Sequence, residues 1–178
     1  MRRIVAGVLA VLLLSACAAT EETPTPVNPT STAVPAASDL PDEAPLGEWV
    51  KSAGFMTMLE STALAVKDIS AALTKIESTD YPSMAAVLKD HADVFTAQAA
   101  ALRNQVPCSD AEYERQKLAL ATAMATYAAA AAALVPADLA TDSDPLAAVL
   151  TQLEDVTTAL NTLGEYVVAN ADTTVTRA

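Results

Sequence analysis

The chain has 178 residues, with 22 acidic and 10 basic side chains, and a formal net charge of −12. So acidic a surface repels nucleic acid and anionic lipid headgroups, which argues against both as direct partners. Only four glycines occur and aromatic residues make up 4% of the chain, which argues against glycine-rich phosphate loops and hairpin turns and favours long helices.

The first sixteen residues have the three parts of a secretory signal. Arg2 and Arg3 give a cationic start, Ile4 to Leu14 forms an apolar run, and Ser15 and Ala16 end it with small side chains. The apolar run of eleven residues is too short to cross a bilayer, because a transmembrane helix needs about 20 residues. We therefore predict that residues 1–16 are a signal peptide.

The end of this leader, Leu14-Ser15-Ala16-Cys17, resembles the lipobox of bacterial lipoproteins. The resemblance implies that Cys17 receives a diacylglyceryl group, that the chain is cleaved before it, and that further acylation, such as with palmitate, follows. Two or three acyl chains anchor a protein stably, whereas one holds it only marginally. The resemblance thus implies a lipoprotein of the bacterial cell envelope, anchored to the membrane through lipid on Cys17 and facing the extracytoplasmic side. It leaves open whether the membrane is the inner or the outer one, or that of a cell with a single membrane.

Residues 17–45 are predicted to form a lipidated, disordered tether. They show neither helical nor strand periodicity, and prolines recur among Thr, Ser, Ala and acidic residues. A flexible chain of this length reaches roughly 30 Å, so it would hold the following domain away from the bilayer.

The domain itself is predicted over residues 46–170, beginning with two amphipathic helices. Apolar residues recur every three or four positions from Leu46 until Ser78–Pro82 breaks the first helix. The second helix is predicted from Pro82 to about Gln105.

Two further helices follow. Ser109 and Glu112 form a predicted capping box that begins the third helix, which runs to about Val135. Asp144 is the predicted N-cap of the fourth helix, whose apolar stripe continues to Val167. Residues 171–178 are predicted to be a frayed tail.

Four helices of similar length with short connections favour one fold class. We predict an all-α protein that forms an antiparallel, up-down-up-down four-helix bundle, with a three-helix core and one peripheral helix as the structural alternative. The stretch 118–135 lacks charge, yet alanine dominates it and contributes little to membrane insertion. We therefore interpret it as a buried central helix and not as a membrane span.

Candidate residues for chemistry are few. His91 is the only histidine, and with Met84 or Met124 it forms a candidate Cu(I) site, because thioether ligands favour that ion. We favour ordinary core packing instead, with His91 bonded to Tyr127 or to a carboxylate. Neither the paired Glu-x-x-His motifs of di-iron bundles nor the Cys-x-x-Cys-His haem motif occurs.

The sequence leaves the roles of two other residues open. With Cys17 acylated, Cys108 is the only thiol, and it is interpreted as a buried loop residue, with an intermolecular disulfide as the alternative. Trp49 is interpreted either as an anchor for a partner or as a side chain that closes one end of the core.

The sequence therefore predicts no catalytic residue, no cofactor and no metal site. The predicted function is that of a lipid-anchored interaction or structural module of the cell envelope, with another envelope protein as partner and no nucleic acid. The alternative is a lipoprotein that binds a small ligand or a metal inside the helical domain.

Overall fold

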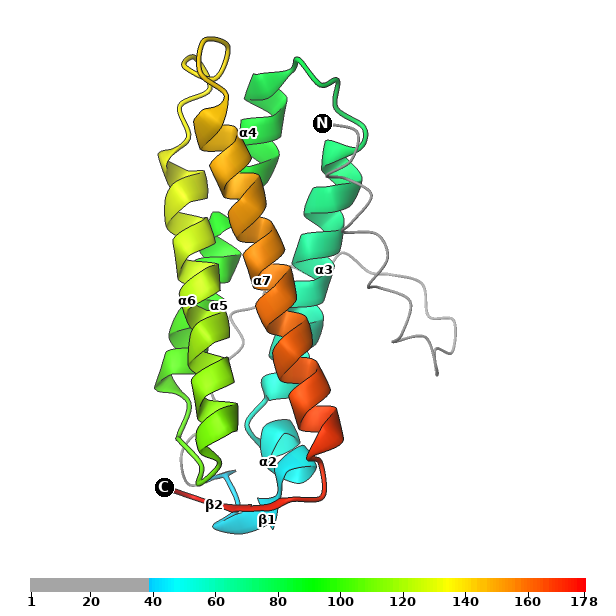
Figure 1. The fold of residues 1–178 in the computed structure, drawn as a ribbon, viewed down its shortest axis with the longest axis vertical. Coiled ribbons are helices and arrows are strands. Elements are labelled where there is room, and N and C mark those ends of the chain that lie inside the picture. The colour runs from blue at the N-terminus through cyan, green and yellow to red at the C-terminus, as the bar shows by residue number, and fades with distance from the viewer. Residues whose placement is uncertain (1–38) are drawn as a thin grey trace.

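Most of residues 39–178, the part of the chain that the computed structural model describes, is helical (Figure 1). Cys17, the signal peptide and most of the predicted tether lie outside these residues. The helices are α2 (Leu46–Ser52), α3 (Phe55–Leu73), α4 (Tyr81–Asp90), α5 (Ala92–Asn104), α6 (Ala111–Ala133) and α7 (Asp144–Ala169). Two short strands, β1 (Glu43–Pro45) and β2 (Thr174–Thr176), complete this part of the fold. The prediction of a mostly helical protein is confirmed.

Helix α6 packs along α5 on one side and α7 on the other, and α3 packs against α4, α5 and α7 (Figure 1). The core between them contains two edge-to-face aromatic pairs. The ring centroids of Phe55 and Tyr113 are 5.7 Å apart, and those of Phe95 and Tyr127 are 4.8 Å apart. Such pairs stabilise a core beyond the burial of their area.

The first predicted helix is in fact two helices. Gly54 has a φ of 68°, the left-handed conformation that glycine adopts without a Cβ clash, and the chain turns there between α2 and α3. The second predicted helix is also divided, at His91, whose φ of −98° and ψ of −6° lie at the edge of the right-handed helical region between α4 and α5.

The predicted caps of the third and fourth helices are wrong by one residue each. Asp110, and not Ser109, caps α6, and its carboxylate accepts hydrogen bonds from the backbone N–H groups of Glu112 and Tyr113. Ser109 is engaged elsewhere, since its hydroxyl oxygen accepts from the N–H of Thr176. In α7, Asp144 is the first helical residue and Ser143 is the N-cap.

The tail is not frayed as predicted. Strand β2 pairs antiparallel with β1, in the register Glu43 with Thr176, Ala44 with Val175 and Pro45 with Thr174. On its other side the C-terminal segment bonds to the α5–α6 loop, where Cys108 and Arg177 form an antiparallel bridge.

The predicted tether also ends earlier than residue 45. Leu40 and Ala44 are buried, and the Arg177 guanidinium donates to the carbonyl of Leu40. The apolar side chains that these segments bury, Val175 among them, explain why both chain segments are ordered at this end of the domain.

Candidate functional site

From Leu118 onward, one side of α6 faces solvent without any charge. Between Leu118 and Val135 the chain has no Asp, Glu, Lys or Arg. We call the exposed residues of this stretch the α6 outer face: Leu118, Ala119, Thr122, Thr126, Ala129, Ala132 and Ala133 of the helix, and Val135 two residues past its end. Leu118 and Val135 are large apolar side chains that remain 48% and 51% exposed. The prediction that the whole stretch is a buried helix is therefore wrong for one side of it.

The threonines on the α6 outer face add little polarity. The Thr122 hydroxyl donates to the carbonyl of Leu118 at 2.8 Å, and the Thr126 hydroxyl donates to the carbonyl of Thr122 at 2.9 Å. Because both hydroxyl protons are used within the helix, the face presents mainly methyl groups and aliphatic carbon to solvent.

A shallow groove runs along this face where α6 meets α7. It has a volume of about 520 Å³, and Gln152 and Asp155 of α7 form its far wall. The α6 side of the groove consists of Arg115, Leu118, Ala119, Thr122, Ala123 and Thr126. The Oε1 atom of Gln152 is itself buried and has no hydrogen-bond partner.

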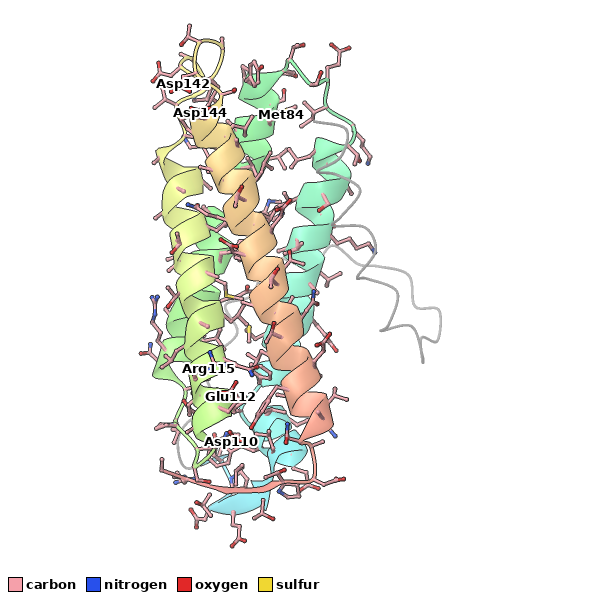
Figure 2. All side chains as sticks on the ribbon, in the orientation of Figure 1. Met84, Asp110, Glu112, Arg115, Asp142 and Asp144 are labelled. Atoms are coloured by element: carbon pink, nitrogen blue, oxygen red, sulfur yellow. The ribbon has the colours of Figure 1, made fainter. Side chains whose placement is uncertain are left out.

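Charged side chains flank the α6 outer face at both ends. Near the start of α6, Arg115 donates to both carboxylate oxygens of Glu112 at 2.8 and 2.5 Å. Hydrogen bonds from Arg115, and then from Gln116, lower the pKa of Glu112 to about 2. At the other end, the α6–α7 connection carries acidic residues, and Figure 2 shows Asp142 and Asp144 far from Arg115.

A second polar cluster lies at the start of α6, inside the domain. Lys117 is only 2% exposed, its Nζ lies 2.6 Å from the Glu114 carboxylate, and it sits 5.5 Å from the centre of the Tyr113 ring. The same carboxylate accepts from the backbone N–H of Cys108 at 3.0 Å. This arrangement is a buried ion pair that connects the α5–α6 loop to the first turns of α6.

Cys108 is buried and its thiol is free, in agreement with the interpretation as a buried loop residue. Burial is the main cause that raises the pKa of this thiol. A raised pKa keeps the neutral thiol at physiological pH, and the neutral thiol is a poor nucleophile.

The candidate copper ligands differ in burial. Met124 is fully buried in the core, whereas Met84 and His91 are partly exposed. His91 Nδ1 lies 3.0 Å from the carbonyl of Val87, so neither predicted partner of His91 was correct. The Tyr127 hydroxyl instead donates to the carbonyl of Leu88 at 3.0 Å. Within residues 39–178, no group of three or more His, Cys, Asp or Glu side chains is arranged to hold a metal ion.

Trp49 closes the core and is not an anchor for a partner, because its side chain is fully buried. The sequence reasoning also missed Lys117 as a buried cation. The sequence does indicate this burial, because Lys117 falls between Tyr113 and Leu120 on the apolar stripe of the third predicted helix. A charged residue at such a position is either buried with the stripe or interrupts it.

Comparisons with known proteins identify no relative of this chain. No family model, no curated protein and no solved structure matches this chain. In the described part of the chain, no helix has both the length and the apolar character to span a bilayer.

Proposed function

We propose that this protein is a lipid-anchored, extracytoplasmic module of the bacterial cell envelope, whose helical domain works by contact with another protein. The lipobox-like Leu14-Ser15-Ala16-Cys17 supports the attachment. Residues 18–38 would then separate the anchored Cys17 from the domain that begins near Leu40.

The observation that carries a contact function is the α6 outer face. An acidic chain of net charge −12 leaves about four helical turns of α6, from Leu118 to Ala133, without charge, and exposes a large apolar side chain at the start of this stretch and another, Val135, just past its end. Contiguous apolar surface on a soluble domain marks sites of interaction. A helix that is apolar all round is normally covered on every side, and in residues 39–178 nothing covers this side of α6.

The proposed arrangement of the domain is an up-down-up-down four-helix bundle. Its four members would be α3, the divided pair of α4 and α5, α6, and α7. The short connections between successive helices support this arrangement, because they favour antiparallel neighbours. In this arrangement α6 lies between α5 and α7, and the α6 outer face remains free for a partner.

A photocrosslinking amino acid at Thr126 tests the contact function in intact cells. Thr57, an exposed threonine on α3, is the matched control position. We expect protein adducts from position 126 in clear excess over position 57, because only the first lies on the uncharged face. Equal and low yields from both positions would contradict the proposal.

A further inference from the structure

We propose that the C-terminal segment is a latch that holds the start of the domain against the helical core, and that its release opens this start while α3 to α7 stay folded. We call residues 171–178 the C-terminal latch and residues 40–53, which contain β1 and α2, the N-terminal plug. Figure 1 shows β1, β2 and α2 together at one end of the domain. The latch itself is independent of the proposed function, and only its consequence for the tether rests on that function.

The C-terminal latch forms backbone hydrogen bonds on both of its sides. On one side its strand β2 pairs with β1 of the N-terminal plug. On the other side the N–H of Ser109 donates to the carbonyl of Thr176 at 2.8 Å, and the N–H of Ala178 donates to the carbonyl of Pro107 at 3.1 Å. The latch is thus the middle one of three extended segments, and it joins the plug to the α5–α6 loop.

The C-terminal latch also caps α2. No side chain caps this helix of seven residues. The N–H groups of its first two residues, Leu46 and Gly47, instead donate to the carbonyls of Thr173 and Ala171 at 2.8 and 2.9 Å. The first N–H groups of a helix have no partner inside it, and a helix this short is not stable in isolation. The first turn of α2 therefore depends on the latch.

Arg177 fastens the other end of the N-terminal plug. Its N–H donates to the carbonyl of Asp42 at 3.0 Å, and its guanidinium donates to the carbonyl of Leu40. Within residues 39–178, no protein group accepts from the buried Nε of Arg177 or from the buried Nε1 of Trp49. A donor buried without an acceptor opposes burial, so the closed plug carries a cost that opening to water removes.

The N-terminal plug has a boundary at which it can separate from α3. The left-handed Gly54 lies directly after it and already divides α2 from α3. Beyond this boundary α3 has its own bonds to α5, because Gln98 Oε1 accepts from the Thr62 hydroxyl and Gln98 Nε2 donates to the Ser61 hydroxyl, both at 2.8 Å. Local opening can therefore stop at Gly54 without spreading into α3.

The balance between the open and closed plug depends on the C-terminal latch. Burial of apolar side chains, of which Trp49 is the largest, favours the closed plug. The conformational entropy of fourteen ordered residues opposes it, and this entropy outweighs the burial of so few large side chains. The backbone bonds to the latch therefore decide whether the plug stays closed.

Release of the latch would lengthen the proposed tether. The N-terminal plug directly follows that tether, so an open plug adds at most about 50 Å of extended chain between Cys17 and the folded helices. Along the chain, a pull on the tether reaches the contacts of Arg177 with Leu40 and Asp42 before the pairs of β1 with β2. The latch then sets how far the anchored domain extends from the membrane.

Limited trypsin digestion of the folded full chain tests the latch. Lys51 lies in the N-terminal plug and Lys67 lies in α3, and both are exposed. Cleavage within a helix requires local opening, so the rate after each lysine measures the opening of its own segment. We expect Arg177→Ala to raise the rate after Lys51 several-fold and to leave the rate after Lys67 unchanged. The control Arg115→Ala removes an exposed arginine that makes no latch contact, and it should change neither rate.

Gly47→Ala tests the latch against helix propensity. A Cβ at Gly47 would lie 3.2 Å from the Cβ of Ala171 and 3.3 Å from its carbonyl oxygen, whereas a Cβ at Gly164 of α7 would meet nothing within 4 Å. Alanine favours a helix over glycine, so propensity alone predicts slower cleavage for both changes. We expect Gly47→Ala to raise the rate after Lys51 several-fold, because it displaces the latch, and Gly164→Ala not to raise it.

A disulfide between the two strands should lock the plug. Glu43 and Thr176 are exposed partners in the β1–β2 register, and such partners lie within the range of a disulfide. Glu43→Cys with Thr176→Cys is made in a chain whose Cys17 and Cys108 are replaced by alanine. We expect the oxidised form to be cleaved after Lys51 several-fold more slowly than the reduced form of the same chain.

Two results would overturn the inference. Equal rates after Lys51 in the oxidised and reduced forms would exclude opening through the latch. An Arg177→Ala variant cleaved faster by the same factor after Lys51 and after Lys67 would show that the latch opens only with the whole domain. Since the digestion does not depend on lipid, and the lipid on Cys17 is measured separately, a failed latch and a failed anchor are distinguished.

Discussion

The Tyr166 hydroxyl lies 3.0 and 2.9 Å from the two carboxylate oxygens of Asp110, and thereby joins the end of α7 to the start of α6. The same carboxylate caps α6 by accepting from the N–H groups of Glu112 and Tyr113. One acidic side chain thus caps the start of α6 and joins it to the end of α7, 56 residues further along the chain.

Loss of this carboxylate should cost more stability than loss of an ordinary cap. We expect Asp110→Ala to lower the free energy of unfolding by about 2 kcal/mol, since a cap contributes about 1 kcal/mol and a partly buried side-chain hydrogen bond a similar amount. Tyr166→Phe should cost about 1 kcal/mol, and the double variant less than the sum, because both changes remove the same bond. Urea denaturation followed by circular dichroism measures all three.

Asp142→Ala is the matched control for Asp110→Ala. The Asp142 carboxylate accepts only from the backbone N–H of Asp144, at an exposed site, so its loss should cost under about 1 kcal/mol. Equal losses for the two variants would show that the bond to Tyr166 contributes nothing.

Removal of Lys117 and removal of Glu114 from their ion pair should lower the free energy of unfolding by different amounts. Lys117 is buried, whereas the Glu114 side chain is 19% exposed. We expect Glu114→Gln to cost about 3 kcal/mol, because it leaves a buried cation without its counter-charge. Lys117→Met should cost about 1 kcal/mol, because it keeps apolar volume and leaves Glu114 within reach of water.

Urea denaturation of the two variants checks this asymmetry. A Lys117→Met variant that loses as much stability as Glu114→Gln would mean that Lys117 contributes through its charge and not through the volume of its stem.

Stability should fall at alkaline pH through two buried tyrosines. Burial raises the pKa of both Tyr113 and Tyr127 well above the usual value of 10. In the unfolded chain these hydroxyls ionise near pH 10, so above that pH the unfolded state binds fewer protons than the folded state and the free energy of unfolding decreases. Below pH 10 both states hold the protons and this contribution is fully present.

Absorbance at 295 nm and helical circular dichroism, recorded together against pH, measure this effect. We expect part of the phenolate absorbance at 295 nm to appear only at the pH at which the helical signal is lost. This part of the absorbance should be smaller in Tyr113→Phe and in Tyr127→Phe. Complete ionisation with the helical signal intact would contradict the burial of these hydroxyls.

The C-terminal segment should protect Cys108 from reagents. Its backbone bonds to the α5–α6 loop on both sides of the thiol, from Ala178 N–H to the carbonyl of Pro107 and from Ser109 N–H to the carbonyl of Thr176. Deletion of residues 174–178 should therefore raise the rate of Cys108 modification by a thiol reagent at least tenfold, since reactivity follows exposure and thiolate content.

Val168→Ala is the control for that deletion, because Val168 is 79% exposed near the same end of α7. It should leave the rate unchanged. An unchanged rate in the deletion variant as well would show that other segments bury the thiol.

The periodicity of apolar residues was enough to predict the helices, because each buried stripe repeats every three or four residues. It missed the division at Gly54, where a single left-handed residue redirects the chain without disturbing the apolar pattern on either side. The division at His91 was missed for the same reason, because the apolar residues keep their helical spacing on both sides of it.

The caps and the tail were wrong for a tertiary reason. Ser109 has the residue type of an N-cap, but its hydroxyl oxygen accepts from Thr176, which is 67 residues away in sequence. The pairing of β2 with β1 is likewise invisible to local pattern, because each strand has only three residues. The candidate contact face was present in the sequence as an uncharged run, but its exposed side becomes evident only once α5 and α7 are in place.

The central claim is that the helical domain works from a lipid anchor. The measurement that tests it most directly is the intact mass of the mature chain, extracted from the membranes of a bacterium that exports it. We predict a chain that begins at Cys17 and carries a diacylglyceryl group, and a Cys17→Ser variant that is recovered without lipid and outside the membrane fraction. A mature chain that begins elsewhere, or begins at Cys17 with an unmodified thiol, would contradict the claim.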